Sequence, residues 1–246
     1  MDAREYRAHQ KLIGLLFENE REYKKGSSYD MVKVARTLEE NGLLKLSLPQ
    51  AQRVALTFEY SGENPLFFMK IMNDTLRNIG LSFVLTTHAA LGSDGFNWQV
   101  SFVSKRVPSP VILAQRLQKR GASIEEIVRE DAAHWRYRID MSGAKIAAIP
   151  ILAGEVKKIV RPVRTVWLDI SHIKRLIVSE LPGSHWFPDL VVYDKMLRIL
   201  SIKQSDERVR YVTLALPPEA VYAKIGDRFT LENIRSGLRV AAKGER

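Results

Sequence analysis

The stretch that decides the fold class of this chain runs Gly95-Phe96-Asn97-Trp98-Gln99-Val100-Ser101-Phe102. Large apolar side chains stand at every second position, and polar ones stand between them. Because successive side chains of a strand point to opposite faces, this alternation predicts a strand with one buried and one solvated face. The solvated face lacks aromatic rings, which argues against the kind of RNA-binding sheet that stacks bases on exposed rings.

Further strands and two helices are predicted on either side of this stretch. Residues 53–60 and 81–88 are rich in apolar, aromatic and β-branched side chains and are predicted to be strands, and 92–95 is a strong turn signal. Asn64 and Ser109, each followed by a proline, are predicted to cap the beginnings of two helices. Glycines at the far end of both periodic segments predict where these helices stop.

The order of these elements, completed by an alternating strand at 135–139, is strand, helix, strand, strand, helix, strand. This is the split β-α-β arrangement of ferredoxin-like folds. Residues 123–131 leave two alternatives open. Ser123 and Glu126 have the spacing of a helical capping box, but the segment also fits a strand that pairs with 135–139. The strand is favoured because turn-like residues flank both ends.

The chain is expected to have three parts. Two amphipathic helices are predicted at the start, one over 4–25 and one that Ser28 caps and Gly42 ends. After Gly143 the helical periodicity stops and short β-rich runs take over. The expected parts are an N-terminal helical segment (1–48), an α/β ferredoxin-like domain (49–142) and a basic β-sandwich domain (143–246).

The β-rich runs follow one another at roughly 8 to 12 residues, a spacing typical of an antiparallel, jelly-roll-like β-sandwich. A short helical turn is expected at 231–236. The fold class is therefore predicted to be α+β. The expected strands of the last domain are 145–151, 165–170, 175–179, 190–193, 198–203, 208–216, 221–225 and 238–241.

The chain is strongly basic, with 38 Lys+Arg against 28 Asp+Glu, a net charge of +10 and a pI near 9.8. The excess is concentrated after Asp140, where 18 basic residues stand against 11 acidic ones. This balance favours acidic partners. We expect an acidic polymer, a glycan or another protein of the cell envelope, and nucleic acid is the less favoured alternative.

Cysteine is absent from the chain, which excludes disulfides, thiolate metal sites and cysteine nucleophiles. Because cysteine is commonly avoided where thiols would be oxidised, a periplasmic or extracytoplasmic location is favoured over a cytoplasmic one. The N-terminus as given has no signal-peptide pattern. No apolar stretch approaches the roughly 20 residues that a membrane helix needs.

No catalytic or metal-binding motif is recognisable. The five histidines lack the spacing of such motifs. Five residues between 169 and 194 carry oxygen or nitrogen atoms that could bind a divalent cation, but their spacing matches no known metal-binding motif. These residues are Asp169, His172, His185, Asp189 and Asp194. We therefore predict no catalytic residue, no metal and no cofactor.

The densest polar and aromatic cluster is the loop 183–189, with Tyr193 just beyond it. In one interpretation Trp186 is a platform for a sugar ring, and His185, Asp189 and Tyr193 are its polar neighbours. In the other, Trp186 fills the end of the sandwich core and Asp189 caps a turn. The second interpretation is favoured because large aromatic side chains before strands are commonly buried.

Basic residues in the last domain could form a stripe that follows a polyanion. The alternative, that they keep exposed strands soluble and unpaired, is favoured. The candidate polyanion-binding residues are Lys157, Lys158, Arg161, Arg208 and Arg210. The sequence as a whole predicts a non-catalytic binding or scaffolding protein. A nucleic-acid-binding protein and a carbohydrate-active enzyme are the alternatives.

Overall fold

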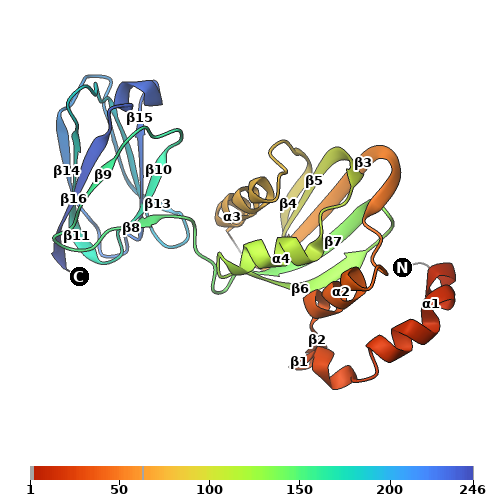
Figure 1. Ribbon diagram of the computed structural model, residues 1–246. Coiled ribbons are helices and arrows are strands. Elements are labelled where there is room, and N and C mark those ends of the chain that lie inside the picture. Colours follow the sequence, from red (N-terminus) through yellow and green to blue (C-terminus); the bar gives the residue numbers. More distant parts are fainter. Residues whose placement is uncertain (1–2, 63, 246) are drawn as a thin grey trace. The chain divides into compact units, whose positions relative to one another are not determined.

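The computed structural model describes residues 3–62 and 64–245, and within them the chain is a mixed α+β protein made mostly of strands (Figure 1). It divides into two compact units, Met1–Ile146 and Ala147–Arg246. The helices of the described residues include none with both the length and the apolar character to cross a bilayer.

The first unit is built around a five-stranded sheet. Its strands, in spatial order, are β4 (Leu85–Gly92), β5 (Gly95–Arg106), β3 (Ser47–Tyr60), β7 (His134–Asp140) and β6 (Ser123–Arg129). β5 lies between β3 and β4 and is antiparallel to both, and helix α3 (Pro65–Asn78) connects β3 to β4 along the chain. β7 pairs parallel with β3, which makes the sheet mixed.

The predicted strand at 95–102 is confirmed as part of β5, and its apolar side chains face a helix-covered core. Trp98 is buried and its ring centroid lies 5.9 Å from that of Phe58 on β3. Phe68 of α3 stacks on Tyr60 at 5.0 Å and meets Phe96 edge-on at 5.9 Å. Helix α3 therefore covers the face of the sheet to which the apolar side chains of β5 belong (Figure 1).

On the opposite face of this sheet, charged side chains of β3, β7 and β6 pair with one another. Glu59 accepts a hydrogen bond from Arg136 at 3.1 Å and lies 3.6 Å from Arg138. Arg138 in turn lies 3.1 Å from Glu126. Gln99 donates to the Thr57 hydroxyl at 3.2 Å. The carboxylates and guanidinium groups of these neighbouring strands thus neutralise one another.

Both predicted helix caps of this unit are confirmed. The Asn64 side chain accepts a hydrogen bond from the Phe67 N–H at 2.9 Å at the beginning of α3. The Ser109 hydroxyl accepts from the Val111 and Ile112 N–H groups before α4 (Pro110–Gln118). These side chains satisfy amide groups that the first turn of a helix leaves without intrahelical partners.

Within the segment 123–131, Ser123–Arg129 form a strand, as the favoured alternative predicts. β6 pairs antiparallel with β7, with Ile124 opposite Ile139 and Ile127 opposite Tyr137. The capping-box pattern does not decide the structure here because Glu126 is used differently. Its carboxylate contacts Arg138 across the strand pair.

The N-terminal helices are shorter than predicted. Helix α1 covers Ala3–Leu16 and is followed by a 3₁₀ turn at Glu20–Tyr23 and by two short paired strands, β1 (Lys24–Lys25) and β2 (Ser28–Tyr29). Helix α2 spans Met31–Glu40. Its cap is Asp30, whose carboxylate accepts from the Lys33 N–H at 2.9 Å, whereas the predicted cap Ser28 belongs to β2.

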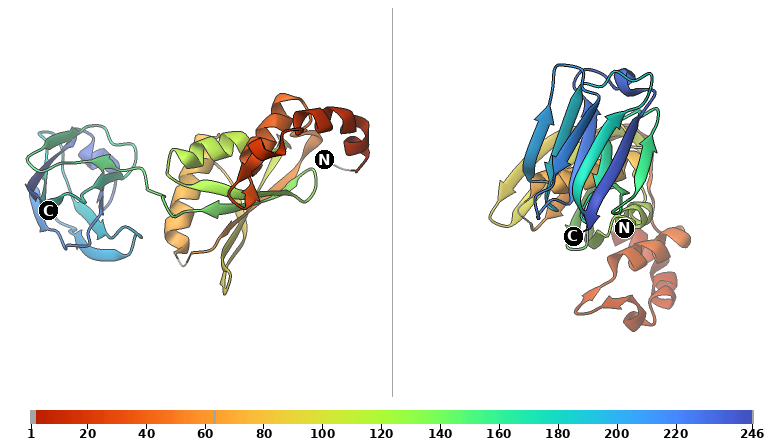
Figure 2. Two further views of the ribbon diagram at one scale, coloured as in Figure 1. Left: turned by 90° about the horizontal axis from the view of Figure 1, so that it is seen from below. Right: turned by 90° about the vertical axis from the view of Figure 1, so that its left-hand side faces the viewer.

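The second unit consists of two sheets that share one core (Figure 2). One sheet has the order β13 (Ile199–Gln204), β12 (Pro188–Tyr193), β15 (Tyr222–Asp227), β10 (Val166–Asp169) and β8 (Ile149–Pro150). The other has the order β14 (Tyr211–Ala215), β11 (Ile173–Glu180), β16 (Leu238–Glu245) and β9 (Val156–Ile159). Buried side chains of both sheets belong to a single cluster.

Most predicted strands of this unit are present within a few residues of their expected bounds. The expected strand 145–151 shrinks to Ile149–Pro150, and it pairs parallel with β10. Strand β9 was not predicted, because Lys157 and Lys158 interrupt the apolar pattern at Val156–Ile159. The expected helical turn is a 3₁₀ helix at Leu231–Ile234.

Limited proteolysis tests whether the two units fold separately. Residues 141–148 form no helix or strand, and the Lys145 side chain in this segment is exposed. We expect trypsin, at a low ratio of protease to protein, to cleave first at Lys145 and to release two fragments. Each fragment should remain folded and unfold cooperatively. Circular dichroism of the separated fragments is the measurement. A single resistant core that is trimmed only at its ends would contradict this division, and also the predicted boundary at 142/143.

Candidate functional site

Trp186 lies entirely within the core of the second unit. Its exposed fraction is 0%, and its indole N–H donates to the Gly226 carbonyl at 2.9 Å. Gly226 belongs to β15, so the bond ties the loop before β12 to a neighbouring strand. The ring offers no face to a sugar, and its burial agrees with the favoured interpretation that Trp186 fills the core.

The other candidates of this cluster do not converge on an exposed cleft. Asp189 accepts a hydrogen bond from the Gln204 amide at 2.7 Å, and the Tyr193 ring stacks on Trp167 at 5.2 Å. Asp189 and Tyr193 stand four residues apart on β12, which separates them by about 13 Å. His185 is exposed before this strand. The structure therefore assembles no polar pocket around Trp186.

Two of the five candidate polyanion-binding residues are already paired with carboxylates. Arg208 lies 2.8 Å from Glu180, and Lys157 lies 2.9 Å from Glu155. Burial tends to raise the pKa of the Glu180 carboxyl, but hydrogen bonds from Arg208 and from the Trp186 N–H outweigh burial and lower this pKa. Glu180 therefore remains ionised and holds Arg208, which weakens the case for Arg208 as a ligand contact.

The remaining three candidates lie in different surroundings. Arg161 follows β9 in a left-handed conformation with φ of 48°, and its N–H donates to the Arg235 carbonyl. Arg210 is exposed just before β14. Lys158 lies on β9, on the outer surface of the four-stranded sheet. The same surface also carries Arg175, Arg239 and Lys243, which are not among the five candidates.

Strand register organises this outer surface, called the basic face from here on, into three rows that cross the strands. The strands of this sheet face the viewer in Figure 2 (right). The first row is Lys158, Arg239, Ser179 and Tyr211. The second is Val156, Ala241, Ile177 and Thr213. The third is Lys243, Arg175 and Ala215. Rows one and three are four residues apart along the strands, or about 13 Å.

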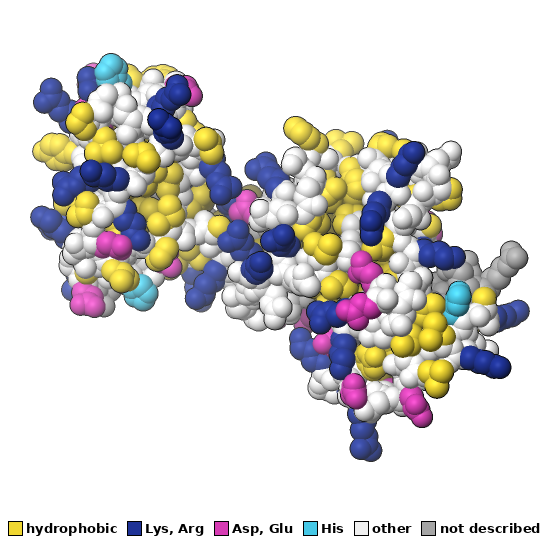
Figure 3. Space-filling model, in the orientation of Figure 1, with side chains coloured by type: hydrophobic (Ala, Val, Ile, Leu, Met, Phe, Trp, Pro, Cys, Tyr) yellow, Lys and Arg dark blue, Asp and Glu magenta, His cyan; other side chains and the backbone are white. Residues whose placement is uncertain are grey.

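The cations of the basic face stand directly opposite one another. Arg239 pairs in register with Lys158, and Arg175 pairs with Lys243. Like charges in directly opposed positions destabilise a sheet. Within the described residues, none of these four side chains has a hydrogen bond or an ion pair. The three rows contain no carboxylate. In Figure 3, Lys and Arg side chains project from the left-hand edge of the second unit.

The middle row makes the basic face amphipathic. Val156 is 47% exposed, and Ile177 and Ala241 beside it are partly exposed. On the basic face, this apolar strip thus lies between the two rows that carry the cations. Tyr211 is the one aromatic side chain of the three rows, and it stands on the edge strand β14.

Sequence patterns could not reveal this face because it depends on pairing between distant segments. Arg175 and Lys243 are neighbours only through the register of β11 with β16. Lys158 was recognised as part of a local basic cluster, but its partner Arg239 stands alone in the sequence. The usable signal is alternation on β16, where Arg239 stands between the buried Leu238 and Val240.

Comparison with known proteins adds no identification: no protein-family model matches the chain, and no curated protein or solved structure is significantly similar to it. Among the described residues, no group of three histidine, aspartate or glutamate side chains is arranged to hold a metal ion. The functional argument therefore depends on the geometry of the chain's own surfaces.

Replacing Trp186 measures its contribution to the core. Trp186→Ala removes a fully buried ring and its hydrogen bond to Gly226, so we expect the second unit to lose about 3 to 5 kcal/mol of unfolding free energy. Trp186→Phe, which keeps most of the ring, is the matched control and is expected to lose less. Urea denaturation followed by circular dichroism is the measurement. An alanine variant that unfolds at the parent's midpoint would show that the ring is not a core residue.

Proposed function

We propose that this chain is a non-catalytic binding protein whose C-terminal unit holds an extended polyanion on the basic face. One observation carries the proposal. Cations stand opposite cations in two places on the basic face: Lys158 faces Arg239, and Arg175 faces Lys243. The rows that contain these pairs have no carboxylate. A negatively charged polymer that lies across both rows would convert this repulsion into attraction.

The proposed ligand is an acidic polysaccharide, such as a cell-envelope polymer. The strip between the cationic rows, formed by Val156, Ala241 and Ile177, suits the apolar C–H faces of sugar rings. Nucleic acid is the less favoured ligand, because sheets that bind single strands use several stacking rings. Here Tyr211 is the only aromatic residue of the rows. A periplasmic or extracytoplasmic location remains part of the proposal.

The proposal extends to the architecture of the two units. The position of β5 between β3 and β4 supports a ferredoxin-like first unit. The parallel strand β7 beside β3 is an addition to that plan. Two sheets around one core support a jelly-roll-like second unit, in which β8 is a parallel addition.

Charge reversal on the basic face tests the proposed function. Arg175→Glu combined with Arg239→Glu should weaken binding to polygalacturonate or dextran sulfate by at least about tenfold, because it removes two cations and adds two anions. The same double variant should be at least as stable as the parent, since each new carboxylate faces a lysine across the strands. Fluorescence anisotropy at several salt concentrations and urea denaturation are the measurements.

The matched control is Lys195→Glu with Arg198→Glu, which makes the same change of charge at the exposed turn between β12 and β13 on the other sheet. This control should bind like the parent. Equal losses in both double variants would mean that net charge alone governs binding, and would overturn the assignment to the basic face. Tighter binding to poly(dT) than to both polysaccharides would favour the nucleic-acid alternative.

A further inference from the structure

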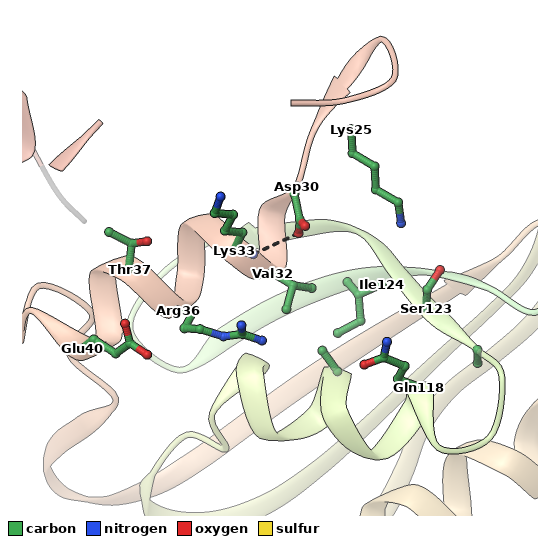
Figure 4. Close-up of a pocket in the computed structure, with 12 residues that line it drawn as sticks. Lys25, Asp30, Val32, Lys33, Arg36, Thr37, Glu40, Gln118, Ser123 and Ile124 are labelled. Carbon is green, nitrogen blue, oxygen red and sulfur yellow. Dashed lines mark hydrogen bonds between the residues drawn. The ribbon is translucent and has the colours of Figure 1, made fainter. Parts of the chain in front are cut away.

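The first unit contains a pocket of about 420 Å³ that is lined by residues of this unit alone. Its walls come from helices α2 and α4, from the start of β6 and from the β1–β2 hairpin (Figure 4). The floor is apolar, formed by Val32, Ala114, Ala122 and Ile124. This volume is in the range of pockets that hold small organic ligands.

Two charged groups at the pocket are already engaged. The Asp30 carboxylate caps α2 by accepting from the Lys33 N–H at 2.9 Å. The Lys33 ammonium donates to the Glu22 carbonyl at 2.8 Å and lies 5.1 Å from the centroid of the Tyr23 ring. In Figure 4 this ammonium points away from the floor. Both groups are therefore held by contacts within the chain.

Two other cations remain without partners among the described residues. The Arg36 guanidinium, on α2, points across the pocket toward the Gln118 amide of α4 (Figure 4). Lys25, from the β1–β2 hairpin, lies on the opposite side of the pocket, where Ser123 also belongs to the lining (Figure 4). Glu40, the remaining carboxylate of the lining, lies at the far end beside Thr37 (Figure 4).

We propose that this pocket binds a small organic anion, with its carboxylate or phosphate held by Arg36 and its apolar body on Val32 and Ile124, while Lys25 adds positive charge from the opposite side. A guanidinium can donate two parallel hydrogen bonds to such a group, and charge-assisted hydrogen bonds are about twice as strong as neutral ones. The Gln118 amide and the Ser123 hydroxyl supply further donors on the facing wall. The apolar floor excludes water from one side of the ligand.

The test uses the full chain with benzoate and phenyl phosphate as probes and neutral benzyl alcohol as their uncharged counterpart. Titrations followed by ¹H–¹⁵N NMR should shift the amide signals of Val32, Gln118 and Ser123 with both anions and not with the alcohol. The tighter of the two anions identifies the acidic group that the pocket prefers. Equal binding of the alcohol would show an apolar hollow without anion recognition, and would overturn the proposal.

Three variants make the test specific to the pocket. Arg36→Met should weaken anion binding about tenfold or more. Glu40→Gln should strengthen it by about two- to fivefold, because it removes a like charge from the ligand's surroundings. Arg116→Met, on the side of α4 away from Gln118, is the control and should bind like the parent. Parent-like binding by Arg36→Met, or absence of any shift at the three amides, would overturn the proposal.

Discussion

The C-terminal unit depends on one constraint, which is that its two sheets share a single apolar core. Leu176 and Val178 of β11 must face inward to meet the buried side chains of the other sheet. A shift of one residue would turn them to solvent, so burial fixes the register of β11 against its neighbours. With the inner set fixed, Arg175 is held on the outside, opposite Lys243. The basic face is therefore a consequence of how the core is built.

Two of the outer sheet surfaces surround their arginines with opposite charges. On the uncovered face of the first unit, Arg136 and Arg138 lie against Glu59, and further carboxylates surround them. On the basic face of the second unit, Arg175 and Arg239 lie against lysines. The same chain can thus neutralise a sheet surface with carboxylates. The unpaired cations of the second unit depart from that local rule, and such departures are expected at functional sites.

The parts of the fold that depend on local chemistry could be predicted from the sequence, and the parts that depend on long-range pairing could not. Asn64 and Ser109 were recognised as caps because the cap and the amide groups it binds lie within three residues of each other. The burial of Trp186 followed from its size and its position before a strand. The basic face and the pocket at Arg36 could not be predicted, because their residues come from separate segments that only the folded chain brings together.

The opposed cations also give ionic strength two contrary effects on the second unit. Dissolved ions screen the repulsion between Arg239 and Lys158, which are exposed to solvent, so added salt should make this unit harder to unfold. The same screening weakens any attraction between the face and a charged polymer. At low salt concentration, the sheet would therefore be least stable without a bound polymer, and its attraction to the polymer would be strongest. A bound polymer would then take over the role that mobile ions have in a concentrated medium.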